Sequence, residues 1–151
     1  MEKIQLTKKV WIGKDEPPII VAEIGLNHNG NINTALEMIK KAKSIGVDAV
    51  KFQVKDVEEA HTKEMLDMPY AGPNSFGKTY REHKQALELS QEELSQIYDY
   101  AKKLDILCFS TPCNVNAVER LEKLNNPIYK IASFHLTFSD ILEKVCKTGK
   151  P

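Results

Sequence analysis

The sequence predicts an α/β protein built on a parallel sheet, with a short β-hairpin in front of it. Short apolar runs alternate along the chain with segments of helical periodicity, which is the pattern of successive strand–helix units. The apolar runs are continuous, as is typical of strands that are buried on both faces of a parallel sheet. The chain has 151 residues, and domains of roughly 100–200 residues are common, so the length fits a single domain.

The elements are expected in a regular order. Alternating apolar residues at 4–6 and 10–12, around the polar turn Thr7-Lys8-Lys9, predict the hairpin. Apolar runs predict four strands, at 19–22, 48–53, 106–109 and 128–131. Helical periodicity predicts four helices, near 34–45, 90–104, 117–124 and 138–147.

Local signals set the ends of these helices. The pairs Thr34–Glu37 and Ser90–Glu93 have the spacing of capping boxes, in which each side chain satisfies a backbone group of the other. Gly46 is expected to end the first helix. The apolar face of that helix is expected to consist of Leu36, Ile39, Ala42 and Ile45.

One connection is much longer than the others, because residues 55–89 separate the second strand from its helix. A loop of this length in a compact domain is usually functional. The stretch from Tyr70 to Tyr80 is open to two interpretations: a lid that excludes water, or a packed surface loop.

Composition excludes several classes of function. Lys and Arg number 21 and Asp and Glu number 21, so the chain has no excess of positive charge with which to bind nucleic acid or an anionic membrane. No apolar run approaches the ~20 residues of a spanning helix, and no signal peptide begins the sequence, so we expect a cytoplasmic protein. The three cysteines show no paired spacing and are expected to be reduced thiols.

Polar side chains gather where the predicted strands end. In parallel α/β folds, ligands bind at the carboxyl ends of the strands. Two lysines on otherwise buried strands favour a phosphate or carboxylate ligand, whereas the alternative is that both lysines form structural ion pairs with Glu23. The residues concerned are Glu23, Lys51, Gln53, Thr111, Lys130 and Ser133.

Four motifs occur in order at these strand ends. They are Ala22-Glu23-Ile24-Gly25-Leu26-Asn27-His28-Asn29-Gly30, Lys51-Phe52-Gln53, Phe109-Ser110-Thr111-Pro112 and Lys130-Ile131-Ala132-Ser133. Together they resemble the sialic acid synthase family, which includes the N-acetylneuraminate and legionaminate synthases. The resemblance extends over nearly the whole chain and includes the hairpin and the long connection.

This resemblance implies a (β/α)8 TIM barrel, of which the chain holds about the first four βα units. It also implies a transferase that condenses phosphoenolpyruvate with an N-acylated amino sugar, such as N-acetylmannosamine. The product would be a nine-carbon 2-keto sugar acid of carbohydrate biosynthesis, formed with release of phosphate. In such a synthase a divalent metal, Mn or Mg, polarises the sugar aldehyde, and its ligands are expected outside this chain.

The resemblance assigns roles to particular residues. Lys51, Thr111, Lys130 and Ser133 are expected to hold the phosphate and carboxylate of phosphoenolpyruvate. Glu23 is expected to bind sugar hydroxyls or to transfer a proton, and Gln53 and Asn74 are further expected substrate contacts. Asn27 and His28 are expected to shape the rim of the site rather than to react.

The chain departs from the family pattern after Ser133, where Phe134 and His135 replace a glycine and an acid. We expect His135 to substitute as a general base, or the activity to be altered, because a neutral imidazole accepts a proton but carries no fixed negative charge. Cys113 is a second departure and is expected to be a packing residue.

Because a (β/α)8 barrel needs about 250 residues, residues 1–151 are expected to be the N-terminal half of one. The C-terminal half and an antifreeze-like domain would then be absent from the chain. Since a half-barrel exposes two sheet edges, we expect a homodimer or a complex with the missing half. The alternatives are a non-catalytic half-barrel that serves as a binding or assembly module, and a flavodoxin-like nucleotide binder. The latter is disfavoured because no Gly-rich phosphate loop opens a helix.

Overall fold

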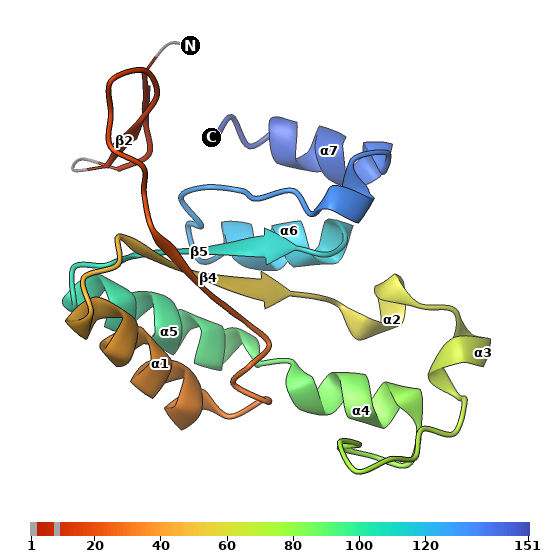
Figure 1. Cartoon of the computed structure of the whole chain (residues 1–151). Helices are drawn as coiled ribbons and strands as arrows, with labels where there is room; N and C mark the ends of the chain where they lie inside the picture. The colour runs from red at the N-terminus through yellow and green to blue at the C-terminus, as the bar shows by residue number, and fades with distance from the viewer. Residues whose placement is uncertain (1–2, 8–9) are drawn as a thin grey trace.

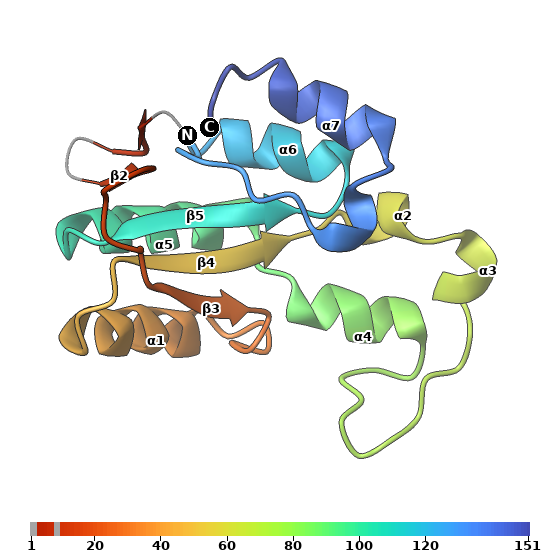
Figure 2. The same cartoon turned by 45° about the horizontal axis from the view of Figure 1, so that its top comes forward.

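A parallel three-stranded sheet, in the order β3-β4-β5, forms the centre of the structure (Figures 1 and 2). Its strands are β3 (Val21–Gly25), β4 (Ala49–Val54) and β5 (Leu107–Pro112). The computed structural model describes residues 3–7 and 10–151. The predicted parallel sheet is confirmed for the first three of its four expected strands.

The predicted hairpin is confirmed as β1 (Ile4–Gln5) paired antiparallel with β2 (Trp11–Ile12). Lys8 and Lys9 of its expected turn lie outside the described residues. The hairpin stands at the end of the sheet where the strands begin, away from their carboxyl ends (Figure 1).

Four helices alternate with the sheet segments: α1 (Ile32–Ser44), α5 (Gln91–Lys103), α6 (Val115–Glu122) and α7 (Ser139–Cys146). Their buried side chains share one hydrophobic core with Val50, Phe52 and Val54 of β4. The helices therefore cover the same face of the sheet, as they do in a barrel of βα units. Within the described residues, no helix combines the length and apolar composition needed to cross a membrane.

The two predicted capping boxes have different outcomes. The box Ser90–Glu93 at the start of α5 is confirmed, with the Ser90 hydroxyl accepting from the Glu93 N–H. The box predicted at Thr34 is wrong, because Asn31 caps α1 and its side chain accepts a hydrogen bond from the Thr34 N–H. The prediction for Ile45 is also wrong: α1 ends one residue earlier, and Ile45 is 76% exposed.

Residues 55–89 are not the irregular loop that the sequence predicted. They contain three further helices, α2 (Val57–Ala60), α3 (Lys63–Leu66) and α4 (Tyr80–Leu87). Each helix has a side-chain cap, from Asp56, Thr62 and Thr79 respectively. The long connection is therefore a folded excursion that leaves the sheet after β4 and returns to it before α5 (Figure 2).

The fourth predicted strand, 128–131, does not form as a regular strand. The segment makes a single parallel bridge, between Ser110 and Tyr129, and the Tyr129 N–H donates to the carbonyl of Pro151 at 2.9 Å. Buried Asn126 anchors it, because its side-chain oxygen accepts from the Ser110 N–H at 3.0 Å and its amide donates to the Ile128 carbonyl at 2.6 Å. A ladder needs continuous partners, and the described residues supply only these contacts. The segment leads into a 3-10 turn, η1 (Ser133–His135), ahead of α7.

The turn between β3 and α1 is fixed by tight packing. His28 is 2% exposed, and its Nδ1 accepts a hydrogen bond from the Gly30 N–H at 3.1 Å. Gly30 has a φ of +72°, and a Cβ at this position would lie 1.9 Å from the carbonyl oxygen of Ala86. Only glycine fits such a close approach, so this turn locks β3 against the end of α4.

Candidate anion-binding site at the strand ends

The two faces of the sheet differ in chemistry because side chains alternate along each strand. Ala49 of β4 and Phe109 of β5 lie with Ile128 in a small apolar cluster on the face opposite the helices. By alternation, Lys51 and Gln53 project from this same face, closer to the carboxyl end. Glu23 pairs with Lys51 in the β3–β4 register, and Thr111 pairs with Gln53 in the β4–β5 register. The half of this face at the carboxyl ends is therefore polar.

Lys51 is the centre of this polar group. It is 8% exposed, its ammonium forms an ion pair with the Glu23 carboxylate, and it donates to the Thr111 hydroxyl at 3.4 Å. The structural ion pair considered from the sequence is thus present for Lys51. An ammonium has three N–H donors, so one remains for a ligand. The Glu23 side chain is 50% exposed, so the partner carboxylate remains accessible to solvent.

Gly25 allows Glu23 and Gln53 to come together. It has a φ of +56°, and a Cβ at this position would lie 3.4 Å from Glu23 Oε1 and 3.6 Å from Gln53 Nε2. The β3–β4 register shifts between Glu23 and Gly25, so the chain turns at this residue. The absence of a side chain here keeps the space between the carboxylate and the amide free.

Lys130 and Ser133 lie on the segment between residue 128 and η1, and both are exposed. The expectation that Lys130 lies on a buried strand is wrong, because the strand does not form and the residue is exposed. The charges of Lys130 and Lys51 both lower the pKa of the Cys113 thiol.

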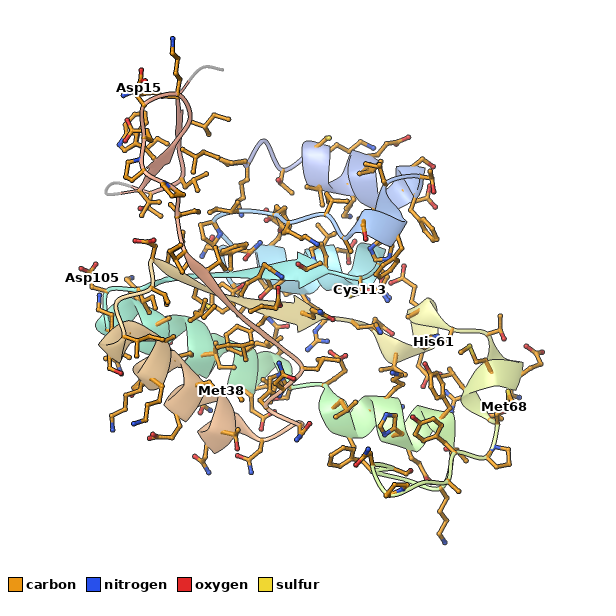
Figure 3. All side chains as sticks on the ribbon, in the orientation of Figure 1. Asp15, Met38, His61, Met68, Asp105 and Cys113 are labelled. Carbon is orange, nitrogen blue, oxygen red and sulfur yellow. The ribbon has the colours of Figure 1, made fainter. Side chains whose placement is uncertain are left out.

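Cys113 directly follows β5 and lies at the opposite end of this strand from Asp105 (Figure 3). Burial raises the pKa of its thiol, while the charges of Lys55, Lys51 and Lys130 act in the opposite direction. A thiol with a raised pKa is a poor nucleophile. The environment of Cys113 therefore does not favour a nucleophilic role. It fits the interpretation of Cys113 as a packing residue.

His135 is 4% exposed and lies between two aromatic rings, with centroids 4.1 Å away at Phe134 and 5.2 Å away at Phe138. Its Nδ1 is buried without a hydrogen-bond partner. Burial lowers the pKa of this imidazole, and the charge of Lys55 lowers it further. His135 is therefore neutral at neutral pH, as a general base or an uncharged hydrogen-bonding group would be.

The structure does not bring Asn74 to this polar group. Asn74 is exposed in the loop between α3 and α4, which lies beyond α4 and away from the carboxyl ends of β4 and β5 in both orientations (Figures 1 and 2). In this loop Tyr70 stacks on His83 with ring centroids 4.4 Å apart, and Phe76 stacks on the same ring at 5.8 Å. These contacts are those of a packed surface loop.

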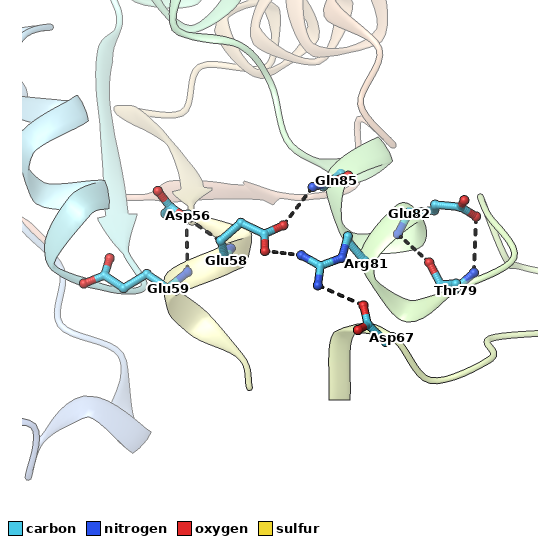
Figure 4. Close-up of polar contacts among 8 residues, drawn as sticks. All are labelled: Asp56, Glu58, Glu59, Asp67, Thr79, Arg81, Glu82 and Gln85. Carbon is cyan, nitrogen blue, oxygen red and sulfur yellow. Dashed lines mark hydrogen bonds and ion pairs between the residues drawn. The ribbon is translucent and has the colours of Figure 1, made fainter. Parts of the chain in front are cut away.

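Charged side chains connect the helices of residues 55–89 to one another (Figure 4). Arg81 of α4 forms ion pairs with Glu58 of α2 and, at 2.9 Å, with Asp67 after α3. Gln85 adds a hydrogen bond to Glu58 at 3.0 Å. One guanidinium therefore links α4 to α2 and to the C-terminal end of α3.

The described residues do not form a ready metal site, because they contain no group of three or more His, Cys, Asp or Glu side chains placed to share an ion. His28 is committed to the turn before α1, and His83 accepts from the Phe76 N–H at 3.3 Å. The divalent metal that the resemblance implies has its ligands expected outside this chain, and the described residues offer no such group for it.

Sequence reasoning missed two residues at the strand ends, Lys55 and Glu88. Lys55 continues the alternation of Lys51 and Gln53 by two residues, so strand periodicity was a signal for it. Glu88 is remote in sequence and lies in the segment interpreted as a loop, yet its Oε2 accepts from the Lys55 N–H at 3.1 Å. No local pattern indicates that contact.

Comparisons with known proteins identify relatives of this chain in sequence and in fold. Residues 38–151 match a family model described as the NeuB family. The chain is 44% identical over 151 residues to the uncharacterized protein MJ1065 of Methanocaldococcus jannaschii, covering 100% of this chain and 41% of that protein. It is 38% identical over 149 residues to the N-acetylneuraminate-9-phosphate synthase of Mus musculus, covering 99% of this chain and 42% of that enzyme.

Among solved structures, the chain is similar to the N-acetylneuraminic acid synthetase of Leptospira borgpetersenii serovar Hardjo-bovis in complex with citrate. The TM-score is 0.81 at 29% sequence identity, and the match covers 99% of this chain and 47% of that one. The chain thus spans less than half the length of each of these three proteins whose structure or sequence it matches.

Proposed function

Starting from the fact that the chain belongs to the NeuB family, we propose that the protein carrying it condenses phosphoenolpyruvate with an N-acylated amino sugar. The reaction forms a carbon–carbon bond between the enol carbon of phosphoenolpyruvate and the aldehyde carbon of the open-chain sugar. Water adds to the resulting cation, and inorganic phosphate leaves by cleavage of the carbon–oxygen bond. The product is a nine-carbon 2-keto sugar acid.

The observation that carries this proposal is the buried ammonium of Lys51 at the carboxyl end of a parallel strand. A cation that is 8% exposed and retains an unused N–H donor is suited to an anionic substrate. We assign the phosphate and carboxylate of phosphoenolpyruvate to Lys51 and Thr111, with Lys130 and Ser133 approaching from the neighbouring segment. Such fixed charges stabilise the negative charge that moves to the departing phosphate.

The sugar is proposed to meet Glu23 and Gln53, whose side chains border the open space above Gly25. Glu23 binds its hydroxyls or transfers a proton. Neutral His135 takes the place of the family acid as a proton acceptor, and Asn74 would reach the sugar only through movement of its loop.

A divalent metal, Mn or Mg, is proposed to be held by residues outside this chain, because the described side chains do not form a site for it. The rest of the barrel is proposed to join at two places. One is the edge of β3, which pairs only with β4 among the described residues; the other is the segment where Pro151 lies beside Tyr129.

The test is a phosphate-release assay on the intact protein with Mn and four mixtures: phosphoenolpyruvate, N-acetylmannosamine, both, or neither. The proposal predicts phosphate only with both, and a new 2-keto acid in equal amount. With oxygen-18 in the bridging position of phosphoenolpyruvate, the label should appear in the phosphate. Absence of release from the complete mixture would contradict the synthase and favour the non-catalytic binding module.

A further inference from the structure

Asn126 is completely buried just before the segment that stands in place of a fourth strand, and its amide group joins that segment to β5. Its Oδ1 atom accepts a hydrogen bond from the Ser110 N–H at 3.0 Å, and its Nδ2 atom donates to the Ile128 carbonyl at 2.6 Å. The Tyr98 hydroxyl of α5 donates to the same Oδ1 atom at 2.7 Å and lies 2.8 Å from the Ser110 hydroxyl. One buried side chain thus holds the backbones of two neighbouring segments, as a strand ladder would do elsewhere in the sheet.

The segment that follows alternates between the two faces of the sheet, although it makes only a single bridge with β5. Tyr129 and Ile131 pack into the hydrophobic core beneath the helices, whereas Ile128 belongs to the small apolar cluster on the opposite face. Lys130 lies between Tyr129 and Ile131 in the sequence, so alternation places its side chain on the face opposite the helices. This is the face that carries Lys51.

The single bridge determines how far along β5 Lys130 lies. It pairs Ser110 with Tyr129 in parallel, so the next residues of the two segments, Thr111 and Lys130, are neighbours. A slip of one residue would turn Lys130 toward the helices, because a strand that slips by one residue presents its side chains to the opposite faces. Such a slip would also break both backbone contacts of Asn126. The contacts of Asn126 and the position of Lys130 therefore depend on the same register.

We propose that Asn126 is a positioning residue of the anion-binding site: its side chain fixes the register that places Lys130 beside Thr111. The inference rests on the proposed function, which gives Lys130 an anionic group of phosphoenolpyruvate as its ligand. Asn126 itself has no exposed surface with which to contact a ligand. An exposed lysine loses conformational freedom when it binds an anion, and a fixed backbone limits that loss.

The test is a double-mutant cycle of Asn126→Ala and Lys130→Met in the intact protein, titrated calorimetrically with phosphoenolpyruvate and with inorganic phosphate. Lys130→Met should weaken binding of phosphoenolpyruvate by roughly ten- to hundred-fold, because it removes a charge-assisted hydrogen bond. Asn126→Ala should also weaken binding, by no more than Lys130→Met does, because it displaces that lysine. The double variant should bind as Lys130→Met alone does, since residues that act through one contact have non-additive effects.

Tyr98→Phe is the matched control. It removes one hydrogen bond from the same buried group and leaves both backbone contacts of Asn126 in place. Thermal melting should show a loss of stability in Tyr98→Phe and in Asn126→Ala, whereas only Asn126→Ala should lose affinity for phosphoenolpyruvate. If Asn126→Ala does not fold, Asn126→Asp replaces it in the cycle: a carboxylate keeps the acceptor for the Ser110 N–H but cannot donate to the Ile128 carbonyl.

The outcomes separate this inference from the proposed function. Affinity losses that multiply in the double variant, or wild-type affinity in either folded single variant, would overturn the positioning role even if the protein catalyses the condensation. If the condensation is not observed but the two substitutions weaken binding of inorganic phosphate without multiplying, the proposed function fails and the positioning role stands. A wild-type protein that binds neither anion would contradict both.

Discussion

Lys51 on β4 and Glu23 on β3 are direct partners in the parallel register, and their side chains form an ion pair on the face of the sheet opposite the helices. The ammonium is buried while the carboxylate is half exposed, so the pair is asymmetric. An exposed carboxylate can leave its partner at little cost, because water compensates for the lost contact. The pair is therefore suited to hold Lys51 in place until an anionic substrate takes over.

Replacing Glu23 with Gln tests this competition. Glu23→Gln removes the negative charge that neutralises Lys51, so phosphoenolpyruvate should bind at least as tightly as it binds the wild-type protein. Turnover with the sugar should fall by about 100-fold or more if Glu23 transfers a proton, or the KM for the sugar should rise if it binds hydroxyls. Calorimetric titration and steady-state kinetics measure the two effects, with Glu37→Gln on the exposed face of α1 as the control. Weaker binding of phosphoenolpyruvate would contradict this role.

Gly30 provides a test of the packing that positions β3. Gly30→Ala would place a Cβ 1.9 Å from the Ala86 carbonyl oxygen at a φ of +72°, so backbone must move. We expect the free energy of unfolding to fall by about 2–4 kcal/mol. Gly46→Ala is a matched control, since its φ is +82° but nothing lies within 4 Å of the added Cβ. The control should lose only about 1 kcal/mol from backbone strain. Urea unfolding measures both variants. If Gly30→Ala and Gly46→Ala lose the same free energy of unfolding, the close approach to Ala86 does not contribute to the loss.

Glu88 makes stability depend on pH in an unusual direction. Burial raises its pKa to about 7, above the value of about 4.3 for an exposed glutamate. The folded protein therefore holds the proton more tightly than the unfolded chain. Its contribution to stability is fully present below about pH 4.3 and is lost as the pH rises through about 7.

Glu88→Gln retains an acceptor for the Lys55 N–H and removes the titrating proton. The variant should lose less unfolding free energy than the wild-type protein between about pH 5 and pH 8, by up to about 3 kcal/mol. Urea unfolding at a series of pH values measures the difference, and Glu64→Gln, exposed on α3, serves as the control. If the free energy of unfolding depends on pH in the same way for the wild-type and Glu88→Gln proteins, the pKa of Glu88 is not raised in the folded state.

The sequence was informative wherever a pattern is local. Strand alternation placed Lys51 and Gln53 on one face, and parallel strands bring their carboxyl ends to one edge, so the meeting of Lys51 with Glu23 and Thr111 was predictable. The cap of α1 was not predictable in this way. Asn31 and Thr34 are both good capping residues, and the choice between them depends on the turn before the helix.

The contents of residues 55–89 escaped periodicity because α2 and α3 have 4 residues each, too few to show an apolar face. The capping box of α4, Thr79 with Glu82, was visible in the sequence and marks the start of that helix. Contacts between distant segments, such as Glu88 with Lys55 and Tyr129 with Pro151, depend on tertiary structure, which local patterns do not encode.

The affinity of Lys51→Met for phosphoenolpyruvate tests the account most directly. The intact protein is titrated calorimetrically, with Lys147→Met at the exposed C-terminal cap of α7 as the control and thermal melting as the check on folding. Removing a charge-assisted contact should weaken binding by about 1.5–3 kcal/mol, which is about 10- to 150-fold, while the control binds as the wild type does. A folded Lys51→Met protein that binds phosphoenolpyruvate with wild-type affinity would contradict the assignment of this strand end as the anion-binding site.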